Sequence, residues 1–125
     1  MEAHHTLLVV DDDMDIRDAL QDALELEGYA VQLAADGLEA LERLRSSEPR
    51  PQLILLDLMM PRMDGVAFRE ALRHERACSD IPVVVASADL DVRGTVDGMG
   101  VAGYLRKPLD LSALLTTVKQ LCLPV

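Results

Sequence analysis

The sequence predicts an α/β protein built on a mainly parallel sheet of five strands with helices on both faces. One observation is that short apolar runs alternate with segments whose apolar residues follow helical spacing. A second is that the apolar runs are continuous, which is typical of parallel strands buried on both faces. The chain of 125 residues is 50% hydrophobic, so we expect a single domain, residues 1–125, with a sizeable core.

The chain begins with a predicted strand, a helix and another strand. Residues 7–10 are a continuous apolar run of strand length. Residues 16–24 carry isoleucine, alanine and leucine at helical spacing, and Gly28 provides a stop signal after them. Residues 29–34 then form the second predicted strand.

The middle of the chain continues the same alternation. Asp36 and Glu39 resemble a capping box, and the leucines of residues 38–44 continue the helix that this box would start. Residues 53–56 form the third predicted strand, and a third helix is expected to follow Asp64.

The last part of the chain contains two more predicted strands, residues 81–86 and 104–105. We expect the fourth helix, between them, to be short or frayed because Gly94 and Gly98 interrupt it. Each glycine costs about 1 kcal/mol relative to alanine inside a helix. Asp110 is placed to cap a last helix whose buried side carries leucine and valine.

Five consecutive strand–helix units suit the flavodoxin-like, doubly wound sheet with strand order 2-1-3-4-5. In such sheets ligands bind at the carboxyl ends of the strands, where the strand order reverses. Here that point lies between the first and third strands. The chemically active residues at the predicted strand ends are Asp11, Asp12, Asp13, Asp57, Ser87 and Lys107.

These residue types together can accept a phosphoryl group. Clustered carboxylates repel one another unless a cation lies between them, and hard oxygen ligands suit Mg²⁺. Asp57 can then act as a nucleophile toward phosphorus and give an acyl phosphate. Lys107 would supply a positive charge to the phosphoryl oxygens, and Ser87 would supply a hydroxyl donor.

Four motifs give the chain a resemblance to a known family. They are VVDDD at residues 9–13, LLDLMMPRMDG at 55–65, VVASA at 84–88 and GYLRKP at 103–108. In combination they resemble the receiver domain of two-component response regulators, of the single-domain, chemotaxis-regulator-like type. The resemblance implies a signalling switch that takes a phosphoryl group from the phosphohistidine of a histidine kinase and regulates a protein partner.

The resemblance also implies a role for each site residue. Asp57 is the expected phosphorylated aspartate. Asp12, Asp57 and the backbone carbonyl of Met59 are expected to bind Mg²⁺ directly, and Asp11 largely through water. Ser87 and Lys107 are the expected catalytic and switch residues that contact the phosphoryl group.

Two features near the end of the chain follow from the same resemblance. The Lys107–Pro108 peptide bond is expected to be cis, which proline tolerates. Tyr104 stands at the position of the switch aromatic residue. Phosphorylation would draw Ser87 toward the phosphoryl group and let Tyr104 turn inward, which changes the face formed by helix four, strand five and helix five.

Two departures from the family pattern have consequences. Glycines break the fourth helix, so we expect a pliable output face, and the partner and dimer mode stay open. Met59 lies two residues after Asp57, and its side chain has no group that hydrogen-bonds an attacking water. We therefore expect the phosphorylated form to be comparatively long-lived.

Composition narrows the partners and the compartment. A formal net charge of -10 at pH 7 disfavours direct binding to nucleic acid or to anionic membranes. No apolar run is long enough for a membrane helix, and residues 1–10 lack the features of a signal peptide. Cys78 and Cys122 have no CxxC spacing and are expected to be reduced in a cytoplasmic protein. The expected partners are a histidine kinase or phosphotransfer protein and a downstream protein target, with the chain a monomer or a phosphorylation-dependent dimer.

The residues also allow two alternative functions. One is a degenerate receiver that is never phosphorylated and acts only as an interaction module, although such proteins usually lack an acidic residue or the lysine. The other is a haloacid-dehalogenase-like phosphatase with Asp11 as nucleophile, because Asp11 and Asp13 have DxD spacing. Met14 and Asp15 do not continue that signature, and 125 residues leave no room for a cap domain.

Overall fold

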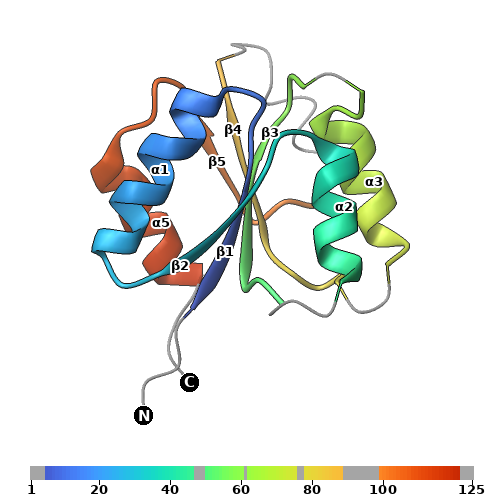
Figure 1. Ribbon diagram of the computed structural model, residues 1–125, viewed down its shortest axis with the longest axis horizontal. Coiled ribbons are helices and arrows are strands. Elements are labelled where there is room, and N and C mark those ends of the chain that lie inside the picture. Colours follow the sequence, from blue (N-terminus) through green and yellow to red (C-terminus); the bar gives the residue numbers. More distant parts are fainter. Residues whose placement is uncertain (1–4, 47–49, 61, 76–77, 89–98, 122–125) are drawn as a thin grey trace.

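The computed structural model describes residues 5–46, 50–60, 62–75, 78–88 and 99–121. Within them, strands and helices alternate along most of the chain (Figure 1). The strands are β1 (Thr6–Val10), β2 (Ala30–Ala34), β3 (Leu53–Asp57), β4 (Val83–Ser87) and β5 (Gly103–Arg106). The helices are α1 (Met14–Leu26), α2 (Gly37–Arg45), α3 (Gly65–Arg73) and α5 (Leu111–Leu121).

The strands form a parallel sheet in the order β2-β1-β3-β4-β5, which confirms the predicted flavodoxin-like α/β fold. The order reverses at β1, which pairs with β2 on one side and with β3 on the other. Val10, the last residue of β1, lies beside Ala34 and Leu56. The carboxyl ends of β1 and β3 therefore lie side by side at the reversal point, where sheets of this kind bind ligands.

Helices cover both faces of the sheet, with α1 and α5 on one face and α2 and α3 on the other (Figure 1). Successive residues of a strand point to opposite faces. Leu7 and Val9 accordingly join the core under α1 and α5, whereas Leu8 and Val10 join the core under α2 and α3. Burial on both faces explains why the strands read as continuous apolar runs.

Aspartates cap all four described helices, with Asp13 for α1, Asp36 for α2, Asp64 for α3 and, as predicted, Asp110 for α5, whose Oδ1 accepts from the N–H of Ser112 at 3.0 Å. The predicted capping box of α2 forms with one difference. Asp36 accepts a hydrogen bond from the backbone N–H of Glu39 at 2.9 Å, but the Glu39 carboxylate accepts from the N–H of Ala35, at 2.6 Å. These caps satisfy N–H groups that a helix start would otherwise leave without partners.

The observed strand boundaries differ slightly from the predicted ones. β4 begins at Val83 rather than at Ile81. Pro82 precedes it and has no N–H to donate to a neighbouring strand. The edge strand β5 extends one residue beyond its predicted bounds at each end, because its pairing with β4 runs from Gly103 to Arg106.

Parts of two predictions cannot be compared with the structure. The fourth helix falls mainly in residues 89–98, which lie outside the described residues, as does Cys122. Cys78 is a buried free thiol. Among the helices that the structure describes, none is long and apolar enough to cross a membrane.

Candidate functional site

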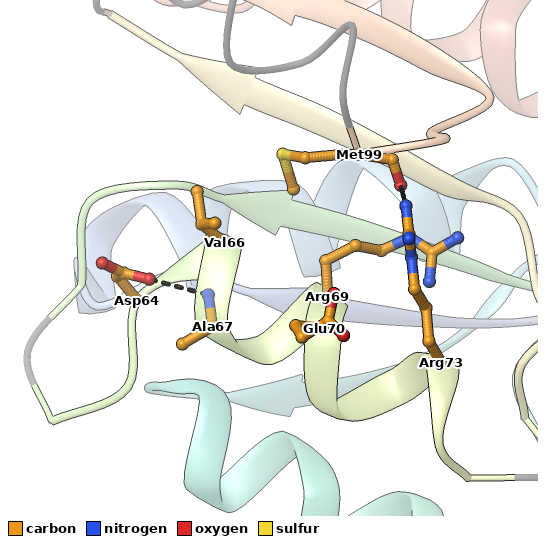
Figure 2. A pocket seen from close by; sticks show the side chains of 7 residues that line it. All are labelled: Asp64, Val66, Ala67, Arg69, Glu70, Arg73 and Met99. Carbon is orange, nitrogen blue, oxygen red and sulfur yellow. Dashed lines mark hydrogen bonds between the residues drawn. The ribbon is translucent and has the colours of Figure 1, made fainter.

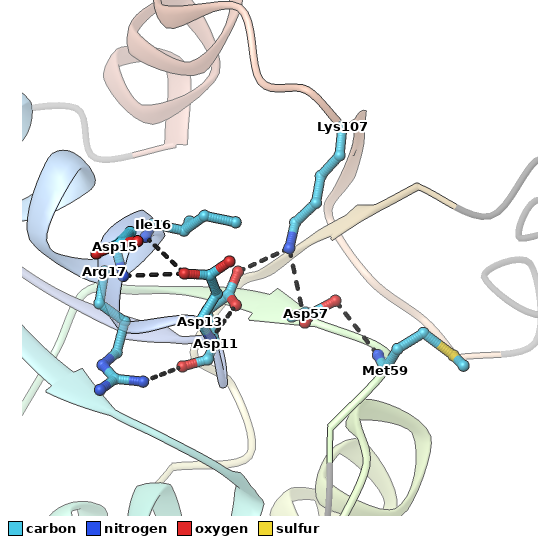
Figure 3. A network of polar contacts seen from close by, with 8 residues as sticks. All are labelled: Asp11, Asp13, Asp15, Ile16, Arg17, Asp57, Met59 and Lys107. Carbon is cyan, nitrogen blue, oxygen red and sulfur yellow. Dashed lines mark hydrogen bonds and ion pairs between the residues drawn. The ribbon is translucent and has the colours of Figure 1, made fainter.

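Four residues with chemically active side chains lie at the carboxyl edge of the sheet. Asp11 directly follows β1, Asp57 and Ser87 are the last residues of β3 and β4, and Lys107 directly follows β5. The Lys107 side chain points toward Asp11 and Asp57 (Figure 3). Parallel pairing thus brings together Asp11 and Lys107, which lie 96 positions apart in the sequence.

Three carboxylates form an acidic cluster where the strand order reverses. Asp11, Asp12 and Asp57 each contribute a carboxylate oxygen, and these oxygens lie within 4.8 Å of one another. Asp11 and Asp57 are only 3% and 6% exposed, whereas Asp12 faces solvent. Buried carboxylates at this spacing need positive charge beside them. Their hard oxygen atoms fit a hard divalent cation such as Mg²⁺.

Lys107 supplies one positive charge to this cluster. Its Nζ lies 2.8 Å from Asp11 Oδ2 and 3.6 Å from Asp57 Oδ2. Its backbone N–H donates to the Ser87 carbonyl at 2.9 Å, and its peptide bond to Pro108 is cis, as the resemblance implies. Burial lowers the pKa of Lys107, but the hydrogen bond and charge of Asp11, with the charge of Asp57, outweigh burial and raise the pKa. The ammonium is therefore charged at neutral pH.

The carboxyl group of Asp57 has a raised pKa of about 6. Burial is the largest cause and the charge of Asp11 adds to it, while Lys107 acts in the opposite direction. Lys107 lies closer to Asp11 than to Asp57, so one ammonium does not balance both carboxylates. The site carries excess negative charge at neutral pH, which a bound divalent cation would offset.

Hydrogen bonds hold the acidic loop after β1 in place. Asp11 Oδ1 accepts from the N–H of Asp13 at 2.9 Å, and Arg17 Nη1 donates to the Asp11 carbonyl at 2.7 Å (Figure 3). The Asp13 side chain caps α1 and is not part of the acidic cluster. Arg17 was not identified from the sequence as a residue of the site, because its acceptor, the Asp11 carbonyl, becomes its neighbour only in the folded chain.

The other residues singled out from the sequence occupy different environments. Ser87 is fully buried at the end of β4. Tyr104 pairs with Val85 in the sheet and packs, partly buried, against the core under α2 and α3. The Met59 side chain is 69% exposed, and its backbone N–H donates to Asp57 Oδ1 at 3.3 Å.

A separate hollow of about 430 Å³ lies along α3 (Figure 2). Arg73 Nη2 donates to the Met99 carbonyl at 2.8 Å, and Arg69 Nη2 donates to the Gly100 carbonyl at 3.4 Å. These bonds join α3 to the segment before β5. None of the described residues that line the hollow belongs to the acidic cluster, so the two features are distinct.

Comparisons with known proteins identify the family of the chain. A family model described as the response regulator receiver domain matches residues 7–119. The response regulators MprA of Mycobacterium ulcerans (strain Agy99) and Mycobacterium tuberculosis (strain ATCC 25177 / H37Ra) are 42% and 41% identical to the chain over 117 residues. Each alignment covers 92% of this chain and 49% of the relative, so the chain spans about half the length of these relatives.

Solved structures show the same architecture. The chemotaxis protein CheY4 of Vibrio cholerae is similar with a TM-score of 0.86 and 30% identity, covering 95% of this chain and 99% of that one. A response regulator receiver protein from Pseudomonas putida has a TM-score of 0.85 and 34% identity, covering 96% and 99%.

The parallel sheet with acidic residues and a lysine at its reversal point has the doubly wound architecture of a receiver domain. The chain belongs to the response regulator receiver domain family of two-component signal transduction.

Proposed function

We propose that the chain is a phosphoacceptor switch in which Asp57 takes a phosphoryl group from the phosphohistidine of a histidine kinase or phosphotransfer protein. The observation that carries this proposal is the meeting of Asp57 with two further carboxylates and Lys107 at the reversal point. Membership of the receiver family supports it. The output is regulation of a downstream protein, with the chain acting as a monomer or as a phosphorylation-dependent dimer.

The transfer exchanges one bond to phosphorus for another. A carboxylate oxygen of Asp57 attacks phosphorus, and the bond between phosphorus and the donor imidazole nitrogen breaks. The imidazole keeps the electron pair of that bond and takes up a proton, and Asp57 becomes an acyl phosphate. Lys107, already 3.6 Å from Asp57, lies where its charge offsets that of the phosphoryl oxygens, and the Ser87 hydroxyl donates to one of them.

The carboxylates of Asp11, Asp12 and Asp57 and the backbone carbonyl of Met59 are the proposed ligands for Mg²⁺, with Asp11 acting largely through water. The spacing of the carboxylate oxygens, within 4.8 Å, and the raised pKa of Asp57 support a cation at this position. When bound, the ion would offset the charge of the carboxylates and of the incoming phosphoryl group.

The proposed output route runs through β5. The Lys107 N–H is hydrogen-bonded to the Ser87 carbonyl, so β4 and β5 are joined at the site itself. A movement of Ser87 toward a phosphoryl group would therefore act on β5, where Tyr104 would turn inward. The face that changes includes β5 and α5, and the fourth helix predicted from the sequence falls mainly in residues 89–98, which are outside the described residues.

The first test is the intact mass of the protein after incubation with acetyl phosphate and Mg²⁺, with Asp57→Asn as the matched control. We expect one added phosphoryl group on the wild type, and none on the variant or in the absence of the metal. No adduct on folded wild-type protein, either from acetyl phosphate or from a panel of histidine kinases, would contradict phosphoacceptance and favour the degenerate interaction module.

No observation favours the haloacid-dehalogenase-like alternative. Asp13, the second acid of its DxD spacing, caps α1, and Asp11 is bound by Lys107. Turnover of a generic phosphate ester by the Asp57→Asn variant would revive this alternative.

A further inference from the structure

An ion pair outside the acidic cluster anchors the loop between β3 and α3. Arg62, in this loop, donates from Nε to Asp36 Oδ2 at 2.6 Å and also contacts this oxygen through Nη2. Asp36 is only 4% exposed, whereas the Arg62 side chain is 62% exposed. The pair therefore fixes an exposed loop to a buried carboxylate at the start of α2.

A backbone contact closes the same junction. The Gly37 N–H donates to the Met63 carbonyl at 3.2 Å. A Cβ at Gly37 would lie 2.7 Å from Met63 Cγ and 2.9 Å from the Met63 carbonyl oxygen, so the two segments are in close contact. Two consecutive residues at the start of α2 thus hold two consecutive residues of the loop, Asp36 with Arg62 and Gly37 with Met63.

Arg62 has a left-handed backbone conformation, with φ at 62°. This region favours glycine, and a residue with a side chain keeps it where its surroundings hold it. Asp36 provides such a contact. Burial raises the pKa of Asp36, but the Glu39 N–H and the Arg62 guanidinium outweigh burial and lower it, so the carboxylate stays ionised for the pair.

The junction is continuous with the acidic cluster. The Asp11 N–H donates to the carbonyl of Ala34, two residues before Asp36. The turn at residues 34–37 therefore connects the backbone of Asp11 to the loop that contains both Arg62 and Met59. A displacement of this loop would move Met59 relative to the carboxylates of the cluster.

We propose that the Asp36–Arg62 pair is a positioning device, which holds the β3–α3 loop so that the Met59 carbonyl is presented to Mg²⁺. This inference rests on the proposed function, because it requires Mg²⁺ between the carboxylates and this carbonyl. Asp36 and Arg62 touch neither the metal nor the phosphoryl group. Their effect is on the affinity of the site for the ion.

Isothermal titration calorimetry with Mg²⁺ tests the pair through Arg62→Gln. We expect the dissociation constant for Mg²⁺ to rise about tenfold, as is typical when residues that orient metal ligands are lost. Labelling by acetyl phosphate should slow at subsaturating Mg²⁺ and recover at saturating Mg²⁺, which a general loss of structure would not produce. The matched control is Arg45→Gln, because Arg45 is 61% exposed and pairs with Glu75 away from the site. It should bind Mg²⁺ as the wild type does.

Asp36→Asn tests the same ion pair by changing its buried partner. Asparagine retains the helix cap but removes the charge, so we expect a similar rise in the dissociation constant. The double variant with Arg62→Gln should bind no more weakly than either single variant, because both changes remove one interaction.

The outcomes separate this inference from the proposed function. Wild-type Mg²⁺ affinity in both single variants, with phosphoacceptance intact, would overturn the positioning role alone. A wild-type protein that binds no Mg²⁺ and takes no phosphoryl group would overturn both.

Discussion

At the scale of residues, burial and unequal pairing set the chemistry of the site. Asp11 and Asp57 are both buried, yet among the described residues one ammonium, that of Lys107, pairs with both and lies closer to Asp11. Burial, together with the charge of Asp11, raises the pKa of Asp57 to about 6, and the more distant Lys107 offsets this rise only in part. Added positive charge near Asp57 would stabilise its ionised carboxylate.

The stability of the metal-free protein should depend on the ionisation of Asp57. The folded-state pKa, about 6, lies above the ordinary value of 3.8, so the folded protein holds this proton more tightly than the unfolded chain. The stabilisation is full below about pH 4 and is lost as the pH rises through about 6, by at most about 3 kcal/mol. Urea unfolding in EDTA at pH values from about 4 to 7 measures this loss of stability. Asp57→Asn should lack this part of the pH dependence. If the free energy of unfolding changes with pH equally in the variant and the wild type, Asp57 has an ordinary pKa in the folded protein.

Met59→Asn should shorten the lifetime of the phosphorylated form. The Met59 side chain is exposed beside Asp57 and offers no hydrogen bond to water, whereas an asparagine amide can orient an attacking water. We expect roughly tenfold faster loss of phosphate, followed by intact mass against time. Met59→Leu, which also lacks a polar group, should decay like the wild type. Decay of Met59→Asn no faster than wild type would count against this role.

At the scale of elements, the sequence patterns predicted the fold well because they report local geometry and burial. Continuous apolar runs predicted strands buried on both faces, and Asp36 and Asp64 predicted helix starts. The bonds made by Arg17 and Arg62 were not predictable in this way. Arginines that lie partly in solvent follow no periodic pattern, and their partners become neighbours only when the chain is folded.

Gly65→Ala should destabilise the start of α3. A Cβ at Gly65 would lie 2.6 Å from the Asp57 carbonyl oxygen and 2.7 Å from Leu58 Cα, and backbone atoms cannot yield as a flexible side chain can. We expect a loss of about 1 to 3 kcal/mol in the free energy of unfolding, measured with urea. Gly103→Ala is the control, because its Cβ would make ordinary contacts of 3.6 Å or more. Equal stability of both variants would show that the loop after β3 can move away.

At the scale of the whole molecule, the acidic site is part of a chain with a formal net charge of -10. Added salt of any kind screens this charge, so specific ion binding has to be separated from screening. Part of this negative charge lies at the edge where β1, β3 and β5 end, because the carboxylates of Asp11, Asp12 and Asp57 gather there beside Lys107.

Mg²⁺ should therefore stabilise the folded protein beyond the effect of ionic strength. At a Mg²⁺ concentration 100 times its dissociation constant, the expected gain is about 2.7 kcal/mol, seen as a higher midpoint of thermal unfolding. Sodium chloride of equal ionic strength is the control, and Asp57→Asn should lose most of the difference. Equal midpoints in the two salts would argue against a specific site.

The distance of 96 positions between Asp11 and Lys107 has a consequence for synthesis and breakdown of the protein. No short fragment contains the complete constellation, because its parts come from strands at both ends of the chain. A nascent chain still lacking β5, or a proteolytic product that has lost it, has the aspartates without the lysine. Such incomplete products should be silent in signalling rather than permanently active.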